Sequence, residues 1–268
     1  MKSVAELLDL TGKTAIVTGG AAGIGQGISR RLAEAGASVL IADIDGEGAR
    51  LTAKELSEAG YRAAGTAADV GDEFDVCDVI DEAIRRFGGV DILVNNAGIY
   101  PNVPLADLEP DTFDHVVAVN LRGVYLFTKF ASELMKKQGR GGRIINVTSI
   151  DALHPSMIGL AAYDATKHGV WGFTKNTAAE LAPFGILVNA VAPGGVMTPG
   201  TQNMTAGPAE GAEAAEAEAM QAAFLAKIPM RRMGEPDEIG KVVLFLASDM
   251  ASYMAGSQVV VDGGALLG

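Results

Sequence analysis

The chain has 268 residues, of which 49% are hydrophobic, and a formal net charge of −12 at pH 7. This length and hydrophobic content are enough for a large buried core, and α/β folds commonly reach this size as one domain. The negative charge argues against binding to nucleic acid or to an anionic membrane surface, and no apolar run is long enough to span a bilayer. Cys77 is the only cysteine, so we expect a reducing, cytoplasmic environment.

A glycine-rich turn follows the first predicted strand. Residues 13–18 (KTAIVT) form a short apolar strand, the sequence TGGAAGIG spans 18–25, and residues 24–35 have apolar side chains at helical spacing. Glycines permit the tight turn and let a ligand approach the backbone, while the free amides at the helix N-terminus can bind a pyrophosphate. The turn therefore predicts a nucleotide site. Its expected contacts are Gly19, Gly23, Ile24 and Gly25.

Asp43 directly follows the second predicted strand, residues 38–42, and lies eighteen residues after Gly25. An acidic residue near this distance typically accepts hydrogen bonds from the adenosine ribose hydroxyls and repels a 2′-phosphate. The other interpretation is that Asp43 only stabilises the turn before Gly46, a role that Asp45 could fill equally well. Asp43 favours NAD over NADP as the cofactor.

The rest of the chain alternates between helices and strands, with no linker and no internal repeat. Strands separated by helices in this way predict a parallel sheet that is covered on both faces. Helices are predicted at about 47–58, 72–87, 111–137, 162–181 and 237–247, and strands at about 62–68, 90–94, 144–147, 186–192 and 258–261. Residues 199–228 contain a stretch rich in Ala and Glu, which we interpret as a substrate lid or, equally, as a solvated surface helix.

Tyr163 and Lys167 lie four residues apart on a predicted helix and so share one helical face. A nearby ammonium favours the phenolate and lowers the pKa of tyrosine from about 10 towards neutrality, as a general acid/base requires. Tyr125 and Lys129 have the same spacing, but no strand end that carries a hydroxyl precedes them by one loop. Ser149 does precede Tyr163 in this way, so we predict that Ser149, Tyr163 and Lys167 act together.

Taken together, the motifs resemble the short-chain dehydrogenase/reductase family over nearly the whole length. They are TGGAAGIG at 18–25, Asp69-Val70, NNAG at 95–98, Asn120 in VNLRG, Ser149, Tyr163 with Lys167, PGGVMT at 193–198 and DGG at 262–264. The resemblance implies a single domain over residues 1–268 with a doubly wound Rossmann fold. Seven parallel strands would carry helices on both faces, with NAD(P) across their carboxyl ends. It also implies a homotetramer in which the helices at 111–137 and 162–181 pack against their copies.

The resemblance further implies a catalytic tetrad of Asn120, Ser149, Tyr163 and Lys167. Tyr163 would exchange the proton of the substrate hydroxyl, and Ser149 would hydrogen-bond the same oxygen. Lys167 would bind the nicotinamide ribose and lower the pKa of Tyr163, while Asn120 would hold a water that links Lys167 to solvent. Ser149 lies fourteen residues before Tyr163, one more than expected for the family, so the path of residues 150–162 is open.

Further residues are implied in cofactor binding. In the family, the positions of Asp69 and Val70 face the adenine, that of Asn95 lies near the adenosine ribose, and the backbone at Val196 with the Thr198 hydroxyl holds the carboxamide. NADPH-dependent members often carry a basic residue inside the glycine turn, where this chain has Ala22. The resemblance and Asp43 therefore both predict NAD.

The substrate pocket is less well defined by the sequence. Asp151 and His154 could hydrogen-bond a hydroxylated substrate beside Ser149 and Tyr163, although an exposed polar loop would also explain them. We predict a small secondary alcohol, such as a sugar, polyol or cyclic alcohol, with steroid-like substrates as second choice. The expected pocket wall is Tyr100, Ile150, Asp151, His154, Met157, Gly195 and Met197.

Two alternatives remain at this point. The first is an NADPH-dependent 3-oxoacyl-carrier-protein reductase, whose docking arginines would align at Leu126 and Ala179, and whose acidic carrier the charge of −12 would repel. The second is a non-catalytic nucleotide-binding regulatory protein. The complete tetrad disfavours the second alternative.

Overall fold

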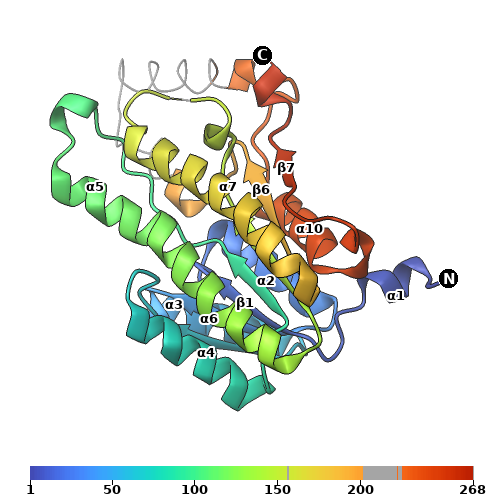
Figure 1. The fold of residues 1–268 in the computed structure, drawn as a ribbon. Helices are drawn as coiled ribbons and strands as arrows, with labels where there is room; N and C mark the ends of the chain where they lie inside the picture. Colours follow the sequence, from blue (N-terminus) through green and yellow to red (C-terminus); the bar gives the residue numbers. More distant parts are fainter. Residues whose placement is uncertain (156, 202–221, 223–224, 268) are drawn as a thin grey trace.

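The computed structural model describes residues 1–155, 157–201, 222 and 225–267 (Figure 1). Within them, seven parallel strands form one sheet in the order β3-β2-β1-β4-β5-β6-β7. This confirms the predicted seven-stranded parallel sheet. The strands are β1 (Thr14–Thr18), β2 (Ser38–Asp43), β3 (Ala63–Ala67), β4 (Ile92–Asn95), β5 (Gly142–Val147), β6 (Ile186–Pro193) and β7 (Gln258–Val261).

Helices cover both faces of this sheet. On one face the core side chains come from α2 (Gly23–Glu34), α3 (Gly46–Glu58) and α10 (Pro236–Ala247). The other face is covered by α4 (Glu73–Phe87), α6 (Gly123–Gln138) and α7 (Ala161–Leu181) (Figure 1). Side chains of these three helices form the second core. The doubly wound Rossmann prediction is therefore confirmed.

Each central strand contributes side chains to both cores, which explains why these strands carry apolar residues on both faces. In β1, Ala15 and Val17 pack in the first core, whereas Ile16 packs in the second. All three are fully buried, as expected for a parallel strand between two helical layers.

The predicted long helix at 111–137 is interrupted. It consists of α5 (Pro110–Val117), a π-helical turn at Ala118–Arg122, and α6. Asn120 lies in this turn and is fully buried, with its side chain hydrogen-bonded to the backbone of Ile99. π-helical turns of this kind occur mostly within α-helices, often at functional sites.

The strand order reverses between β1 and β4, and a crevice forms at the carboxyl ends of the strands at such a point. The turns that leave β1 and β4 are TGGAAGIG and NNAG, so both motifs reach this crevice.

A short first helix, α1 (Val4–Leu8), is an addition to the predicted elements. Most of the predicted lid at 199–228 lies outside the described residues. No helix in the described part of the chain has the length and apolar composition needed to span a bilayer.

Candidate active site

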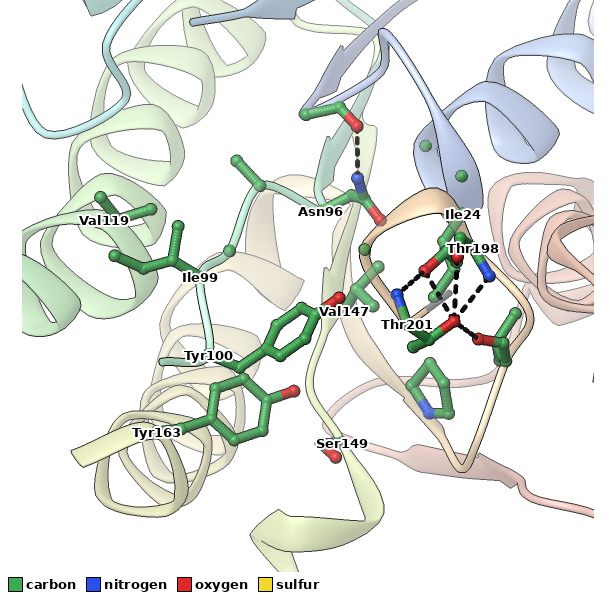
Figure 2. A pocket seen from close by; sticks show the side chains of 18 of the residues that line it. Ile24, Asn96, Ile99, Tyr100, Val119, Val147, Ser149, Tyr163, Thr198 and Thr201 are labelled. Atoms are coloured by element: carbon green, nitrogen blue, oxygen red, sulfur yellow. Dashed lines mark hydrogen bonds between the residues drawn. The ribbon is translucent and has the colours of Figure 1, made fainter. Parts of the chain in front are cut away.

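A cavity of about 620 Å³ lies at the carboxyl edge of the sheet (Figure 2). This volume is within the range of small-molecule and cofactor sites. Its walls include the glycine turn, the loops after β2, β3 and β4, the end of β5, the first turns of α7, and the loop after β6. The cavity therefore joins segments that are far apart in the sequence.

The glycine turn is packed too closely for side chains. Gly19 has a φ of +63°, and a Cβ there would lie 2.7 Å from Ala97 Cα. A Cβ on Gly25 would lie 2.1 Å from the carbonyl oxygen of Gly19. Asn96 fixes the turn by donating to the carbonyl oxygens of Thr18 and Gly19, at 2.9 and 2.8 Å. The turn therefore brings the backbone itself to the cavity wall.

The N-terminus of α2 opens onto this wall. Its N-cap residue is Ala22, which makes no capping hydrogen bond, so no N-cap side chain satisfies the first amides of the helix. Gly23, Ile24 and Gly25 all line the cavity. Free amides and the positive end of the helix dipole suit a pyrophosphate, so the residues present fit the expected dinucleotide.

Asp43 lines the cavity next to the glycine turn. Its carboxylate accepts hydrogen bonds from the backbone amides of Ala21 and Asp45, each at 3.0 Å, which hold it against the glycine turn. Asp45, Asp69 and Val70 line the cavity as well. Among the described lining residues Lys167 is the only Lys or Arg. The charge around Asp43 is therefore negative.

Asn95 lies away from the cavity, contrary to the position predicted for it near the adenosine ribose. It is buried, and its amide donates to Asn146 Oδ1 at 2.8 Å and to Thr128 Oγ1 at 3.2 Å. Asn96 is the asparagine that lines the cavity. Alternation along β4 explains the difference, because Asn95 shares a face with Leu93, and α6 covers that face.

Ser149, Tyr163 and Lys167 meet in the cavity (Figure 2 shows Ser149 and Tyr163). The Lys167 ammonium donates to the Val147 carbonyl oxygen at 2.8 Å and lies 5.5 Å from the centroid of the Tyr163 ring. The ring of Tyr100 packs edge-on against that of Tyr163, with centroids 6.0 Å apart. Residues 150–162 contain a one-turn 3-10 helix, Ile150–Ala152, before α7 begins.

Asn120 lies behind Lys167 and does not line the cavity. A Cβ on Gly98 would lie 3.3 Å from Asn120 Oδ1 and 3.5 Å from Lys167 Nζ, so both side chains approach the same glycine. The side-chain amide of Asn120 donates hydrogen bonds to Ile99 O and Thr166 Oγ1. Its oxygen accepts one hydrogen bond from the backbone amide of Ile99. One lone pair of its oxygen therefore remains for a further donor.

Burial controls the ionisation of Tyr163 and Lys167. Burial raises the pKa of Tyr163, a hydrogen bond with Ser149 lowers it, and the charge of Asp151 raises it again. Burial lowers the pKa of Lys167 to about 8, and Asp151 opposes this shift. In the protein alone the pKa of Tyr163 is thus raised, opposite to the direction expected from Lys167.

We expect Lys167→Met to stabilise the fold while abolishing turnover. The shift of the Lys167 pKa from 10.5 to about 8 corresponds to about 3 kcal/mol of destabilisation while the lysine is charged. Below pH 8 this cost is fully present, and it disappears as the pH rises from about 8 to 10.5, because only the folded state loses its proton there. Urea unfolding at pH 7 measures the difference.

Loss of the bond to Val147 O should offset about 1 kcal/mol of the gain from Lys167→Met. Lys129→Met, at the other tyrosine and lysine pair, is the control. A Lys167→Met protein that is less stable than the native one at pH 7 would contradict this electrostatic interpretation.

Beside Ser149, Asp151 is 6% exposed, lines the cavity and accepts a hydrogen bond from the Ser149 hydroxyl at 2.7 Å. Four further members of the predicted pocket wall line the cavity, namely Tyr100, Ile150, Met157 and Gly195. His154 and Met197 do not. His154 lies exposed, with its ring bonded to the Pro155 carbonyl oxygen, because the chain leaves the 3-10 turn towards solvent after Ala152.

Val196, Thr198 and Thr201 line the cavity, and Figure 2 shows Thr198 and Thr201 across it from Tyr163. The Thr201 hydroxyl bonds to Thr198 N at 2.8 Å and to Val196 O at 3.0 Å. Sequence reasoning missed Thr201, and it also missed His115, which lines the cavity from α5. In the described residues no group of three or more His, Cys, Asp and Glu side chains is arranged to hold a metal ion.

A doubly wound sheet, a glycine turn at its switch point and a tyrosine and lysine pair in the same cavity define a class of nucleotide-dependent oxidoreductases. Comparison with known proteins agrees. A family model described as enoyl-(acyl carrier protein) reductase matches residues 19–265. A crystal structure of a short-chain type dehydrogenase/reductase from Mycobacterium marinum has a TM-score of 0.90 and 34% identity, covering 98% of this chain and 99% of that one. The chain belongs to the short-chain dehydrogenase/reductase family.

Its curated relatives have different activities. Oxidoreductase UcpA of Escherichia coli strain K12 is 39% identical over 96% of both chains. 3beta-Hydroxysteroid dehydrogenase 2 of Eggerthella lenta is 39% identical over 95% of both chains. 3-Oxoacyl-[acyl-carrier-protein] reductase FabG of Thermotoga maritima is 37% identical over 96% of this chain and 99% of its own. Relatives at this distance support oxidoreductase chemistry and leave several substrates open.

Proposed function

We propose that the protein is an NAD-dependent oxidoreductase that interconverts a secondary alcohol and its ketone. One observation carries the proposal: Ser149, Tyr163 and Lys167 line the same cavity as the glycine turn. A bound nicotinamide dinucleotide would supply the hydride acceptor or donor. The chain's own groups would then handle the proton and the orientation of the substrate.

In this proposal Tyr163 takes the proton of the substrate hydroxyl during oxidation and returns it during reduction. Ser149 Oγ binds the same oxygen and orients it. Lys167, held by Val147 O, places its remaining N–H donors towards the nicotinamide ribose. Its charge, with that of an oxidised nicotinamide ring, would oppose the burial that raises the pKa of Tyr163.

We predict that NAD is preferred to NADP because of Asp43. A 2′-phosphate on the adenosine ribose would meet the carboxylates of Asp43 and Asp45 without a Lys or Arg beside them among the described lining residues. Asp43→Ser should raise kcat/KM with NADP relative to NAD by at least about tenfold, since like charges close together cost several kcal/mol. Asp107→Ser, at an exposed acid outside the cavity lining, is the control. A native protein that prefers NADPH would contradict the assignment.

The proposed substrate is a small polar secondary alcohol. Ser149, Asp151 and Tyr163 supply polar groups to one part of the cavity wall, where the reacting oxygen is proposed to bind. His154, the fourth residue predicted there, lies at the exposed surface. Initial rates on sugars, polyols, cyclic alcohols and steroid alcohols test the class. Turnover confined to hydrophobic steroid alcohols would reject the polar substrate, and no turnover with any alcohol would reject the activity.

The carrier-protein reductase remains the second candidate, because FabG enzymes are among the relatives. Leu126 is one of the two positions where the docking arginines of a carrier-protein reductase would align. It is 2% exposed and packs in the core, so it is not a docking position in this chain. Reduction of a 3-oxoacyl-carrier-protein with NADPH, faster than oxidation of any alcohol with NAD, would make this candidate the better one. Turnover of an alcohol with NAD, or of a 3-oxoacyl-carrier-protein with NADPH, would exclude a purely regulatory protein.

We also propose a homotetramer built on α5, α6 and α7. Phe113 and Tyr125 support it, being 40% and 44% exposed on α5 and α6. Val124, Phe127 and Val170 do not support it, because they are buried inside the chain itself. Light scattering should give four times the chain mass of 27.6 kDa. A species of one chain mass only would reject the assembly.

A further inference from the structure

Tyr100 lies directly beside Tyr163 in the cavity. Their rings pack edge-on with centroids 6.0 Å apart, and Figure 2 shows the two side chains next to each other, with both hydroxyls on the same side. A substrate oxygen that is hydrogen-bonded to Tyr163 Oη lies roughly 5 Å from the centre of the Tyr163 ring. The ring of Tyr100 and the reacting alcohol are therefore both neighbours of Tyr163.

The hydroxyl end of Tyr100 contacts the segment after β6. A Cβ on Gly200 would lie 2.3 Å from Tyr100 Oη and 3.5 Å from its Cζ. Since a Cα–Cβ bond is about 1.5 Å long, this hydroxyl lies within about 4 Å of Gly200 Cα. Every residue other than glycine has a Cβ, so Gly200 makes the contact possible. Tyr100 thus reaches from the loop after β4 to the segment after β6, and both residues line the cavity.

The backbone on both sides of Tyr100 is anchored. Ile99 makes two hydrogen bonds with the Asn120 side chain, each at 2.8 Å. The Val103 amide donates to the Gly159 carbonyl oxygen at 2.9 Å. Tyr100 is therefore a fixed part of the cavity wall, because its backbone is held on both sides and its ring packs against Tyr163.

We propose that Tyr100 is a specificity residue that admits only a small substituent on one side of the reacting carbinol carbon. An alcohol oxygen held by Ser149 and Tyr163 leaves its two carbon substituents pointing in different directions, and one of them faces Tyr100. The preferred substrates are then secondary alcohols with one compact substituent, such as methyl or hydroxymethyl. This inference rests on the proposed function, and it goes further because it names the shape of the substrate.

The test compares 2-heptanol with its isomer 4-heptanol, using NAD and the native protein. The two alcohols contain the same atoms, but 4-heptanol carries a propyl group on both sides of the carbinol. One extra methylene in a pocket typically costs about 10-fold to 200-fold, so kcat/KM for the better enantiomer of 2-heptanol should exceed that for 4-heptanol by at least about tenfold. Tyr100→Ala should bring this ratio close to one. Leu105→Ala, at a 79% exposed residue outside the cavity lining, should leave the ratio unchanged.

Gly200 allows a second test that leaves the Tyr100 side chain intact. In Gly200→Ala the new Cβ forces the Tyr100 hydroxyl to move, so the ratio should change by at least about fivefold. Tyr100→Phe removes this hydroxyl and leaves Cζ at an ordinary contact distance of 3.5 Å from the new Cβ. The double variant, Tyr100→Phe with Gly200→Ala, should therefore have the same ratio as Tyr100→Phe alone, which keeps the ring and most of the native preference.

Because each ratio is measured within one protein, partial misfolding of a variant does not affect it. Equal kcat/KM for the two heptanols with the native protein would overturn the inference but leave the proposed alcohol dehydrogenase standing. So would a native ratio that is retained in Tyr100→Ala, or one that Gly200→Ala does not change.

If neither heptanol is oxidised, the wider panel of alcohols decides the proposed function. Calorimetric titration with both heptanols in the presence of NAD then decides the inference separately. Tighter binding of 2-heptanol to the native protein, lost in Tyr100→Ala, supports it. Equal binding of the two isomers to the native protein overturns it.

Discussion

Tyr163→Phe should reduce kcat for alcohol oxidation by about 100-fold to 10,000-fold while leaving NADH binding close to the native value. The substitution removes only the phenolic oxygen, which is the group proposed to exchange the substrate proton, and general acid/base catalysis typically contributes this factor. The ring and its edge-on contact with Tyr100 remain. Steady-state rates, together with NADH titration by fluorescence, measure the two quantities.

Tyr125→Phe is the matched control for this result. Tyr125 and Lys129 repeat the four-residue spacing of Tyr163 and Lys167, but Tyr125 is 44% exposed on α6 and lies outside the cavity lining. Its substitution should leave kcat within about twofold, because it keeps the ring that the proposed subunit contact uses and removes no group of the cavity. A Tyr163→Phe protein with near-native turnover would remove Tyr163 from the mechanism.

Gly25→Ala should abolish tight NADH binding and destabilise the fold. The added Cβ would lie 2.1 Å from the Gly19 carbonyl oxygen and 2.6 Å from Asn96 Nδ2, so the glycine turn and the residue that holds it must both move. Overpacking of this kind costs about 1–3 kcal/mol. The displaced backbone includes the amides proposed to bind the pyrophosphate, so the Kd for NADH should rise at least tenfold, or by about 1.4 kcal/mol.

The control for Gly25→Ala is Ala22→Gly, in the same turn. This change adds no atoms, and glycine is a better N-cap than alanine, so stability and NADH binding should be retained. Calorimetric titration with NADH, and thermal unfolding of both variants, separate loss of binding from loss of fold. Native-like NADH affinity in Gly25→Ala would show that the cofactor does not bind at this turn.

The fold was predictable because the local signals agree. Buried strands such as β1 are apolar on both faces, and the Gly19 and Gly25 turn stands between strand and helix, where a doubly wound fold requires it. The break in the long helix was harder to predict. The segment around Asn120 continues the helical pattern, and its π-helical turn depends on contacts with Ile99, which is distant in sequence.

The sequence predicted which residue types form the candidate site better than it predicted the directions in which their side chains point. Two adjacent asparagines begin NNAG, and the alternation of β4, with Leu93 and Asn95 on the α6 face, would have favoured Asn96 as the cavity residue. The outward position of His154 depends on where a 3-10 turn ends. The hydrogen bond from Ser149 to Asp151 could not be predicted, because side chains two residues apart meet only in this backbone conformation.

In the proposed reaction a hydride passes from the alcohol to the nicotinamide within this cavity, while Tyr163 takes the hydroxyl proton. The most direct measurement uses the best alcohol of the panel with deuterium on its carbinol carbon, incubated with NAD and the native protein. We expect the NADH formed to carry the deuterium, and we expect little product from Tyr163→Phe under the same conditions. Oxidised alcohol accompanied by NADH without deuterium, or by no NADH, would contradict it.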